Sequence, residues 1–227
     1  MRKIIFVIAL TVTMIGVQSA HADEATTALM VKGKIIPGSC TPTLSDGGKI
    51  DYGTISSSSL FDDSNSLGVK NMTLHISCSD SGYVGFTATD NRSDSLPEHI
   101  EVVNVKNNDD YRLFGLGKTA EDKVIGAFTI DVDTTNIKVD GKNYGFVYIL
   151  YSTNGTSWLS NTVNIRSYSD KAPNIEALIN KTGVGVRAFK EAEIPLVINT
   201  SIVDARDLSV TDKVMLDGNV TFNIIYL

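Results

Sequence analysis

The chain has 227 residues, a formal net charge of −6 at neutral pH and 20% charged residues. This acidic balance argues against a nucleic-acid-binding protein, because surfaces that bind nucleic acid are basic. Short runs of Val, Ile, Thr, Tyr and Phe are separated by Gly, Asn, Asp and Ser, and helical periodicity is scarce. The composition therefore predicts one all-β domain with a sizeable core.

The first 22 residues have the pattern of a secretory signal peptide. Arg2 and Lys3 precede an apolar run, and Ala20-His21-Ala22 is a small-x-small cleavage site. We therefore expect cleavage after residue 22 and export across the inner membrane to the periplasm. No later stretch reaches the roughly 20 apolar residues of a membrane span, so we expect no transmembrane segment after cleavage.

Strands are predicted wherever short β-branched and aromatic runs lie between turn residues. These runs cover residues 29–36, 69–78, 83–89, 100–105, 111–116, 124–132, 137–139, 144–152, 184–189, 194–203 and 220–226. Asp140-Gly141 and Asn154-Gly155 are dipeptides that favour tight hairpins. One short helix is expected over residues 173–181, with Asn174 as its cap. So many short strands predict a sandwich or a barrel.

The only two cysteines, Cys40 and Cys78, are expected to form a disulfide, because the chain is predicted to enter an oxidising compartment. A metal site would need more ligands nearby, and a redox pair more often reads C-x-x-C. Closing a loop of roughly 40 residues would contribute about 4 kcal/mol on the chain-entropy model. The bond would tie the first strand to a strand whose inward face carries Met72, Leu74 and Ile76.

The last predicted strand alternates apolar and polar side chains up to the penultimate residue. Thr221 and Asn223 fall on one face, whereas the other face carries Val220, Phe222, Ile224 and Tyr226. No charge, proline or covering loop follows to protect the edge, and such an edge invites pairing with another chain. An ordinary last strand within a sheet is the alternative interpretation.

The sequence contains no motif that organises a catalytic site, so we expect a protein that is not an enzyme. The histidines of the mature chain, His75 and His99, lack a nucleophile-elbow or zinc-binding pattern around them. The segment GLGKT at 115–119 ends like a phosphate loop but lacks the first glycine, and a hairpin turn explains it better. The segment DVDTTN at 131–136 lacks the glycine and glutamate of a calcium loop. No metal or cofactor is expected.

Aromatic residues leave one binding possibility open. They gather around the Asn154-Gly155 turn and comprise Tyr144, Phe146, Tyr148, Tyr151 and Trp158. Core packing accounts for most of them, but aromatic platforms also stack on sugars, so a carbohydrate-binding adhesin remains an alternative.

Three segments resemble the subunits of chaperone–usher fimbriae. They are TALMVKGKIIPGSC at 27–40, GGKIDYGTI at 47–55 and TFNIIYL at 221–227, the last with a penultimate tyrosine. More narrowly, IPGSCTP followed by GGKIDYG is similar to GltF-type periplasmic proteins, a fimbrial-like group of unknown function. The resemblance covers residues 29–89 and 218–227, and residues 91–190 carry no motif of this kind.

The resemblance implies an immunoglobulin-like, pilin-type sandwich over residues 33–227 that lacks its last strand. A periplasmic chaperone and then another subunit would fill the resulting groove during assembly at an outer-membrane usher, and the fimbrium at the cell surface would support adhesion. Residues 23–32 would be the donated strand, with Ala25, Thr27, Leu29 and Val31 on its inserted face. The acceptor groove would lie beside Val220, Phe222, Ile224 and Tyr226. Alternatively, residues 23–32 are the first strand of a self-contained monomer.

Overall fold

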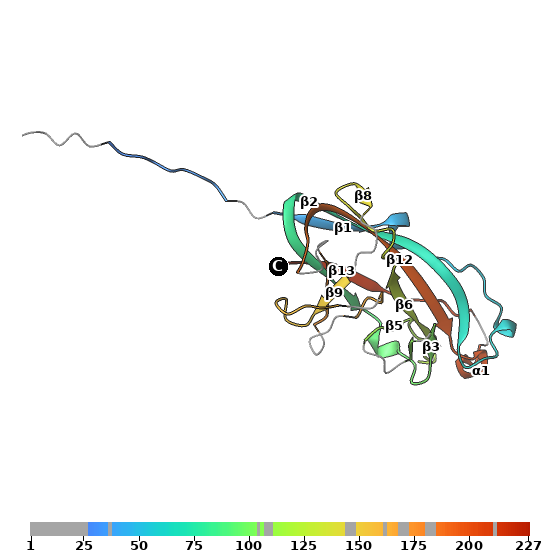
Figure 1. Ribbon diagram of the computed structural model, residues 1–227. Coiled ribbons are helices and arrows are strands. Elements are labelled where there is room, and N and C mark those ends of the chain that lie inside the picture. The colour runs from blue at the N-terminus through green and yellow to red at the C-terminus, as the bar shows by residue number, and fades with distance from the viewer. Residues whose placement is uncertain are drawn as a thin grey trace, which may run out of the picture. The chain divides into compact units, whose positions relative to one another are not determined.

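A computed structural model of the chain describes residues 27–35, 38–103, 105–106, 111–143, 149–160, 163–167, 173–179, 185–210 and 213–227 (Figure 1). The chain divides into two units between Ile36 and Pro37, and each is considered by itself. The predicted signal peptide lies outside the described residues. Within the described ranges, no helix is long and apolar enough to cross a membrane.

Residues 27–35 of the first unit form no regular secondary structure, so the strand predicted over 29–36 is wrong for the described part of that range. Leu29 is 91% exposed and Val31 is 90% exposed. A β-strand exists only where a neighbouring strand completes its hydrogen bonds, and no described residue pairs with this segment. Apolar alternation alone therefore does not make it a strand.

Most of the second unit is formed by two antiparallel sheets that share one very long strand, β2 (Asn65–Asp90), and a separate pair of short strands makes a third sheet. In the first sheet, the strand order is β1 (Cys40–Leu44), β2, β12 (Ala188–Ile202), β6 (Gly126–Val132) and β5 (Phe114–Gly115). In the second sheet, the order is β13 (Val220–Tyr226), β2, β11 (Ile175–Leu178), β9 (Ile149–Ser152) and β10 (Leu159–Ser160). Figure 1 shows β2 curving from one sheet into the other.

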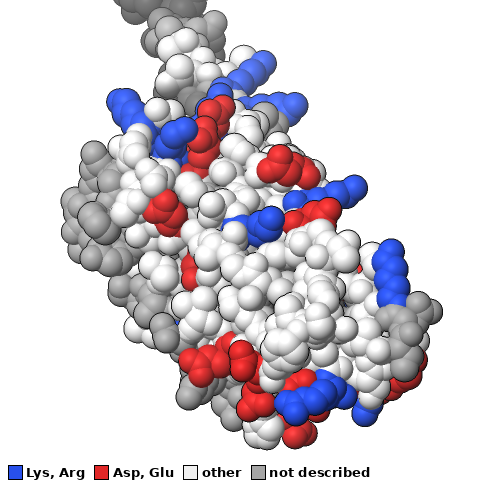
Figure 2. Space-filling view, turned by 90° about the vertical axis from the view of Figure 1, so that its right-hand side faces the viewer, with Lys and Arg blue, Asp and Glu red and all other residues white. Residues whose placement is uncertain are grey.

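Short elements complete the described fold. The pair β7 (Lys138–Val139) and β8 (Lys142–Asn143) extends β12, and β3 (Glu101–Val102) pairs with β4 (Val105–Lys106). Single helical turns are η1 (Ser45–Gly48), η2 (Ser57–Ser59), η3 (Ser93–Ser95) and α1 (Ala205–Leu208). On the face in Figure 2, basic and acidic side chains are interspersed around a broad area without charged residues.

The two sheets enclose a common apolar core, which confirms the predicted all-β class. Leu74 and Ile76 from the first half of β2 pack in the same cluster as Val84 and Phe86 from its second half. The predicted disulfide is confirmed, because Cys40 on β1 is bonded to Cys78 on β2. As predicted, Met72, Leu74, Ile76 and Cys78 are all buried.

Two pairs of predicted strands are each one continuous strand. Residues 79–82 continue β2, and β12 joins the predicted strands 184–189 and 194–203. The pairing of β12 with β2 shifts register between Phe189 and Glu191, and this irregularity lies where β2 turns from one sheet to the other. The polar residues at these corners resemble a loop in sequence, yet they lie within continuous strands.

The predicted helix over 173–181 is wrong for its described part, which contains β11. This strand is paired on both sides, with β9 and β2, so tertiary pairing overrides the helical pattern. Because β11 is buried on both faces, its one charged side chain needs hydrogen-bond partners inside the protein. The fully buried Glu176 accepts a hydrogen bond from the Arg166 N–H at 3.1 Å.

The two turn dipeptides behave differently. Asp140 and Gly141 both have positive φ angles, 50° and 73°, and join β7 to β8 as a tight hairpin. The segment around Asn154 is a longer loop between β9 and β10, with the Asn154 side chain accepting backbone hydrogen bonds from Thr156 and Ser157. Only the first dipeptide forms the predicted tight hairpin.

Candidate functional site

The last strand, β13, has one edge that is unpaired within the part of the chain that the structure describes. Its bounds match the predicted range, and its other edge pairs with β2 from Val220 opposite Asp90 to Tyr226 opposite Val84. The register determines which backbone groups point away from β2.

Hydrogen-bonded residue pairs alternate along an antiparallel ladder. The Asn91 N–H donates to the Asn219 carbonyl at 3.0 Å, and the Leu227 N–H donates to the Tyr83 carbonyl at 3.1 Å. The odd-numbered residues of β13 therefore direct their backbone groups to β2. The even-numbered residues, which are Val220, Phe222, Ile224 and Tyr226, direct theirs to the unpaired edge.

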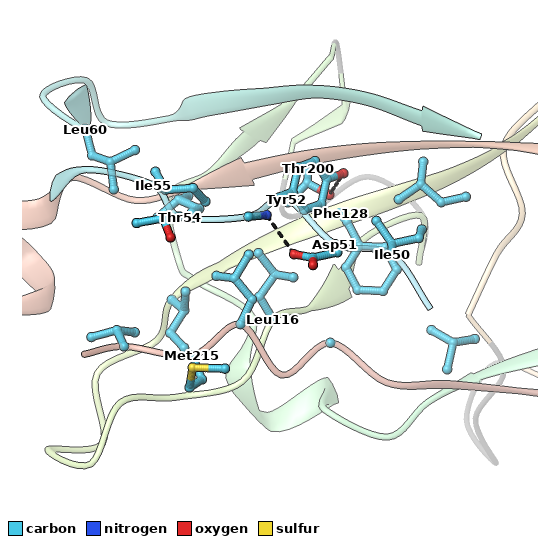
Figure 3. Close-up of a pocket in the computed structure, with 18 of the residues that line it drawn as sticks. Ile50, Asp51, Tyr52, Thr54, Ile55, Leu60, Leu116, Phe128, Thr200 and Met215 are labelled. Atoms are coloured by element: carbon cyan, nitrogen blue, oxygen red, sulfur yellow. Dashed lines mark hydrogen bonds between the residues drawn. The ribbon is translucent and has the colours of Figure 1, made fainter. Parts of the chain in front are cut away.

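An apolar groove of about 910 Å³ lies beside the first part of this strand (Figure 3). Residues 48–57 form one wall, and the chain from residue 213 to 222 forms the other. Side chains of β6, β12 and the β5–β6 region form its floor, namely Leu116, Phe128, Ile130, Leu196 and Ile198. The groove is thus an opening onto the core rather than a separate surface pocket.

The second wall continues the alternation of β13 upstream of the strand. Val214, Leu216, Val220 and Phe222 line the groove and are half-buried, whereas Met215 is 61% exposed. At Gly218 a Cβ atom would lie only 2.9 Å from the Phe128 ring, so the backbone approaches the floor as closely as glycine allows.

The first wall contains a segment that we call the strap, residues 50–55, which runs along the groove without being a strand. No backbone–backbone hydrogen bond joins the strap to any described strand. It is held by side chains instead: Ile50 and Ile55 pack against the core, and the Tyr52 hydroxyl donates to Thr200 Oγ1 at 2.8 Å. The Lys70 ammonium lies 5.4 Å from the centroid of the Tyr52 ring.

Burial raises the pKa of Tyr52 above its ordinary value, so its hydroxyl keeps the proton that it donates to Thr200. Next to it, the Asp51 carboxylate accepts a hydrogen bond from the Gly53 N–H at 2.7 Å (Figure 3). Gly53 has a φ of 68°, a conformation that a residue with a side chain rarely adopts. These contacts explain why Asp, an aromatic residue and Gly follow one another in the strap.

The start of β13 is anchored by polar contacts. Asp90, which is buried, accepts hydrogen bonds from the Gly115 N–H at 2.9 Å and the Arg92 N–H at 2.8 Å. Burial raises the pKa of this carboxyl. Arg92 also forms an ion pair with Asp217 at 2.6 Å, and the Asp217 N–H donates to the Leu116 carbonyl. The wall before β13 is therefore fixed without strand pairing.

The far end of β13 is tied to the disulfide. The Tyr226 hydroxyl accepts a hydrogen bond from the Cys40 N–H at 2.8 Å, and Cys40 is bonded to Cys78. Tyr226 is 58% exposed, and neither it nor Ile224 lines the groove. Of the four predicted groove residues, the structure thus places Val220 and Phe222 in the groove and the other two beyond it.

The predicted donor residues all belong to the first unit. Ala25 lies outside the described residues, and Thr27, Leu29 and Val31 are exposed. The strap and the floor were not among the predicted site residues. The GGKIDYG motif was the only sequence signal for the strap. The floor residues belong to strands whose sequence pattern is that of ordinary core strands.

The other candidate residues form no comparable site. His75 lines a surface hollow of about 140 Å³ with Lys138 and Glu193, and His99 is exposed before β3. The GLGKT segment is a hairpin, as predicted, because the Thr119 N–H donates to the Lys123 carbonyl.

In the DVDTTN segment, Asp133 accepts hydrogen bonds from Thr135 and Asn136, which lowers the pKa of its carboxyl. The described residues include no group of three or more potential metal ligands. Of the aromatic cluster, residues 144–148 lie outside the described ranges. Trp158 is half-buried, and Tyr151 packs under the Arg166 guanidinium at 4.2 Å.

Comparison with known proteins supports the narrower resemblance. Residues 29–129 match a family described as "Protein of unknown function (DUF1120)". The chain is 29% identical to protein GltF of Escherichia coli (strain K12) over 92% of each chain. It is 26% identical to the uncharacterized protein YhcF of the same organism, over 92% of this chain and 93% of YhcF. The chain is therefore similar to GltF and YhcF along most of its length, and neither name states an activity.

Proposed function

We propose that this protein is an exported, non-catalytic structural subunit that completes its sheet with a strand supplied by another chain. The unpaired edge of β13 beside an open groove onto the core is the observation that supports this proposal. An edge of this kind is a template for strand addition, in which main-chain hydrogen bonds give affinity and side-chain pockets give specificity.

The groove offers both kinds of interaction. Val220 and Phe222 turn their side chains to the core and their backbone groups to the unpaired edge. An inserted strand can therefore bury apolar side chains on the groove floor while it hydrogen-bonds to β13. A single inserted strand would therefore cover the core side chains that line the groove and complete the hydrogen bonds of the unpaired edge of β13.

The proposed donor is the N-terminal segment, residues 23–32. Its residues Leu29 and Val31 lie on one face when the chain is extended, and both are exposed. Burying them would contribute about 3–6 kcal/mol, at about 1.5–3 kcal/mol for each side chain. Hydrogen bonds to the unpaired edge would add about 0.5–1.5 kcal/mol each, so the backbone supplies a large part of the affinity.

By its resemblance to fimbrial subunits, the protein would be held by a periplasmic chaperone and assembled at an outer-membrane usher into a surface fimbrium that supports adhesion. The similarity to GltF and YhcF is compatible with this assignment but does not name a partner. Assembly by strand addition needs no cofactor or catalytic group.

The test uses the full mature chain with its own donor disabled by Leu29→Asp and Val31→Asp. A synthetic peptide of residues 23–36 should bind this variant and increase the yield of folded monomer after dilution from urea. A peptide with the same two substitutions is the matched control and should do neither. If the disabled chain refolds fully alone and ignores the peptide, the sheet is self-sufficient and the proposal fails.

A further inference from the structure

We propose that Asp51 selects the donor strand by charge, and that the donor it fits is residues 27–35 of a second copy of this chain. This inference rests on the proposed function, because it concerns what enters the same groove. It goes further by naming the partner and a residue that distinguishes it from other strands.

Among the described residues that line the groove, only Asp51 and Lys213 are charged. Lys213 already interacts with another part of the chain. Asp51 is exposed, and its carboxylate accepts one backbone hydrogen bond, from Gly53. It forms no ion pair with any residue that the structure describes. The groove therefore presents one carboxylate whose charge is not neutralised by a described neighbour.

Asp51 lies at the rim of the groove rather than on its floor. Its neighbours Ile50 and Tyr52 are half-buried, whereas Asp51 is exposed between them (Figure 3). On the opposite wall, Asp217 is paired with Arg92 and Lys213 interacts with another part of the chain, while Thr221 and Asn223 on the exposed face of β13 are uncharged. Asp51 on the strap is therefore the groove residue whose charge is left to discriminate between donors.

The chain's own N-terminal segment has the complementary pattern. Residues 27–35 include Lys32 and Lys34 and no acidic residue, and the acidic residues of the proposed donor, Asp23 and Glu24, lie at its opposite end. In an extended strand, Leu29 and Val31 share one face, and the lysines lie on the other. When the apolar face meets the groove floor, the lysines point to the rim, where Asp51 also lies. Opposite charges on neighbouring strands attract, and like charges repel.

This arrangement would favour a second copy over a strand with acidic residues at the same positions. Such a strand would bury equivalent apolar side chains but would bring like charges together at Asp51. Discrimination between partners commonly depends on repulsion of the wrong one.

The experiment measures peptide binding by fluorescence polarisation to the full mature chain that carries Leu29→Asp and Val31→Asp. The probes are the labelled peptide of residues 23–36 and its Lys32→Glu/Lys34→Glu version. At low salt the unmodified peptide should bind about fivefold more tightly than the glutamate version. Adding Asp51→Lys to the chain should reverse the preference, and 1 M NaCl should abolish it.

Asp51→Asn is the conservative variant, since an amide oxygen can still accept the Gly53 hydrogen bond while the charge is removed. It should bring the affinity ratio of the two peptides close to one. Asp80→Lys is the matched control, because Asp80 is exposed on β2 and does not line the groove. It should leave the fivefold ratio unchanged.

The outcomes separate the two proposals. If both peptides bind and their affinity ratio is the same with Asp, Asn or Lys at position 51, the selection by charge is wrong and strand addition stands. If neither peptide binds to any variant, both proposals fail.

Discussion

Replacing Phe222 by alanine tests the groove at the residue where it meets the core. Phe222 is half-buried on β13 and lines the groove. Its ring centroid lies 6.2 Å from that of Phe86, with an interplanar angle of 53°, and Phe86 is 1% exposed. The substitution therefore removes a contact within the core and a surface against which a donor would pack.

The expected loss of stability follows from this partial burial. Truncating a fully buried phenylalanine costs about 3–5 kcal/mol, so a half-buried one should cost about 2 kcal/mol. The tilted ring pair accounts for about 0.5–1.5 kcal/mol of that amount. Asn223→Ala is the matched control, because Asn223 is the next residue of β13 and is exposed. It should change the free energy of unfolding by less than about 0.5 kcal/mol.

Urea unfolding of the mature chain, followed by the fluorescence of the single tryptophan, Trp158, measures the effect. With an m-value of about 2 kcal/mol/M, Phe222→Ala should lower the midpoint by about 1 M. A donor peptide at 100 times its dissociation constant should add about 2.7 kcal/mol to the stability of the chain with Phe222. At the same concentration it should add clearly less to Phe222→Ala.

Two results would refute this reasoning. A midpoint that moves no further for Phe222→Ala than for Asn223→Ala would show that the ring contributes little to the core. Equal stabilisation of both chains by the peptide would show that a donor does not dock against Phe222.

Three further changes test other parts of the assembly. Under the proposed function, deleting residues 23–32 should leave a folded protein that a periplasmic chaperone still binds but that forms no polymer. Polymers of normal length in electron micrographs would refute the donor assignment. Asp90→Asn should lower the free energy of unfolding by about 1–3 kcal/mol, because one amide oxygen replaces the two carboxylate oxygens that accept hydrogen bonds from the Gly115 and Arg92 N–H groups. Burial raises the pKa of Asp90 in the folded state, so the folded protein binds the carboxyl proton more tightly than the unfolded chain does. The difference in free energy of unfolding between wild type and the variant, measured in urea, should therefore decrease as the pH rises above 3.8. Replacing Cys40 and Cys78 by serine should cost about 4 kcal/mol, and an unchanged urea midpoint would contradict the loop-closure estimate.

The sequence was sufficient to predict β13 because its signal is local. Alternation with period two identifies both the strand and the face that carries Val220 and Phe222. The same reasoning predicted the inward face of β2 and, with the predicted oxidising compartment, the disulfide. Each of these features depends on residues that are close in sequence or on a single pair of cysteines.

The rest depends on packing between distant segments. The sequence over 173–181 resembles a helix, but β11 forms there because β9 and β2 pair with both of its edges. The strap contains no strand pattern, and its place on the groove depends on the bond from Tyr52 to Thr200. A local pattern contains no information about a partner that lies far away along the chain.

The proposed donor has a small apolar face, so side chains at the rim of the groove must decide which donor strand is selected. Leu29 and Val31 are the large apolar residues among the predicted inserted positions, and burying them is equally favourable for any strand with similar side chains. Backbone hydrogen bonds to β13 do not depend on side-chain identity either. The two largest sources of affinity therefore cannot distinguish one donor from another. Selection must come from side chains at the edge of the groove, and Asp51 is the charged group that the strap places there.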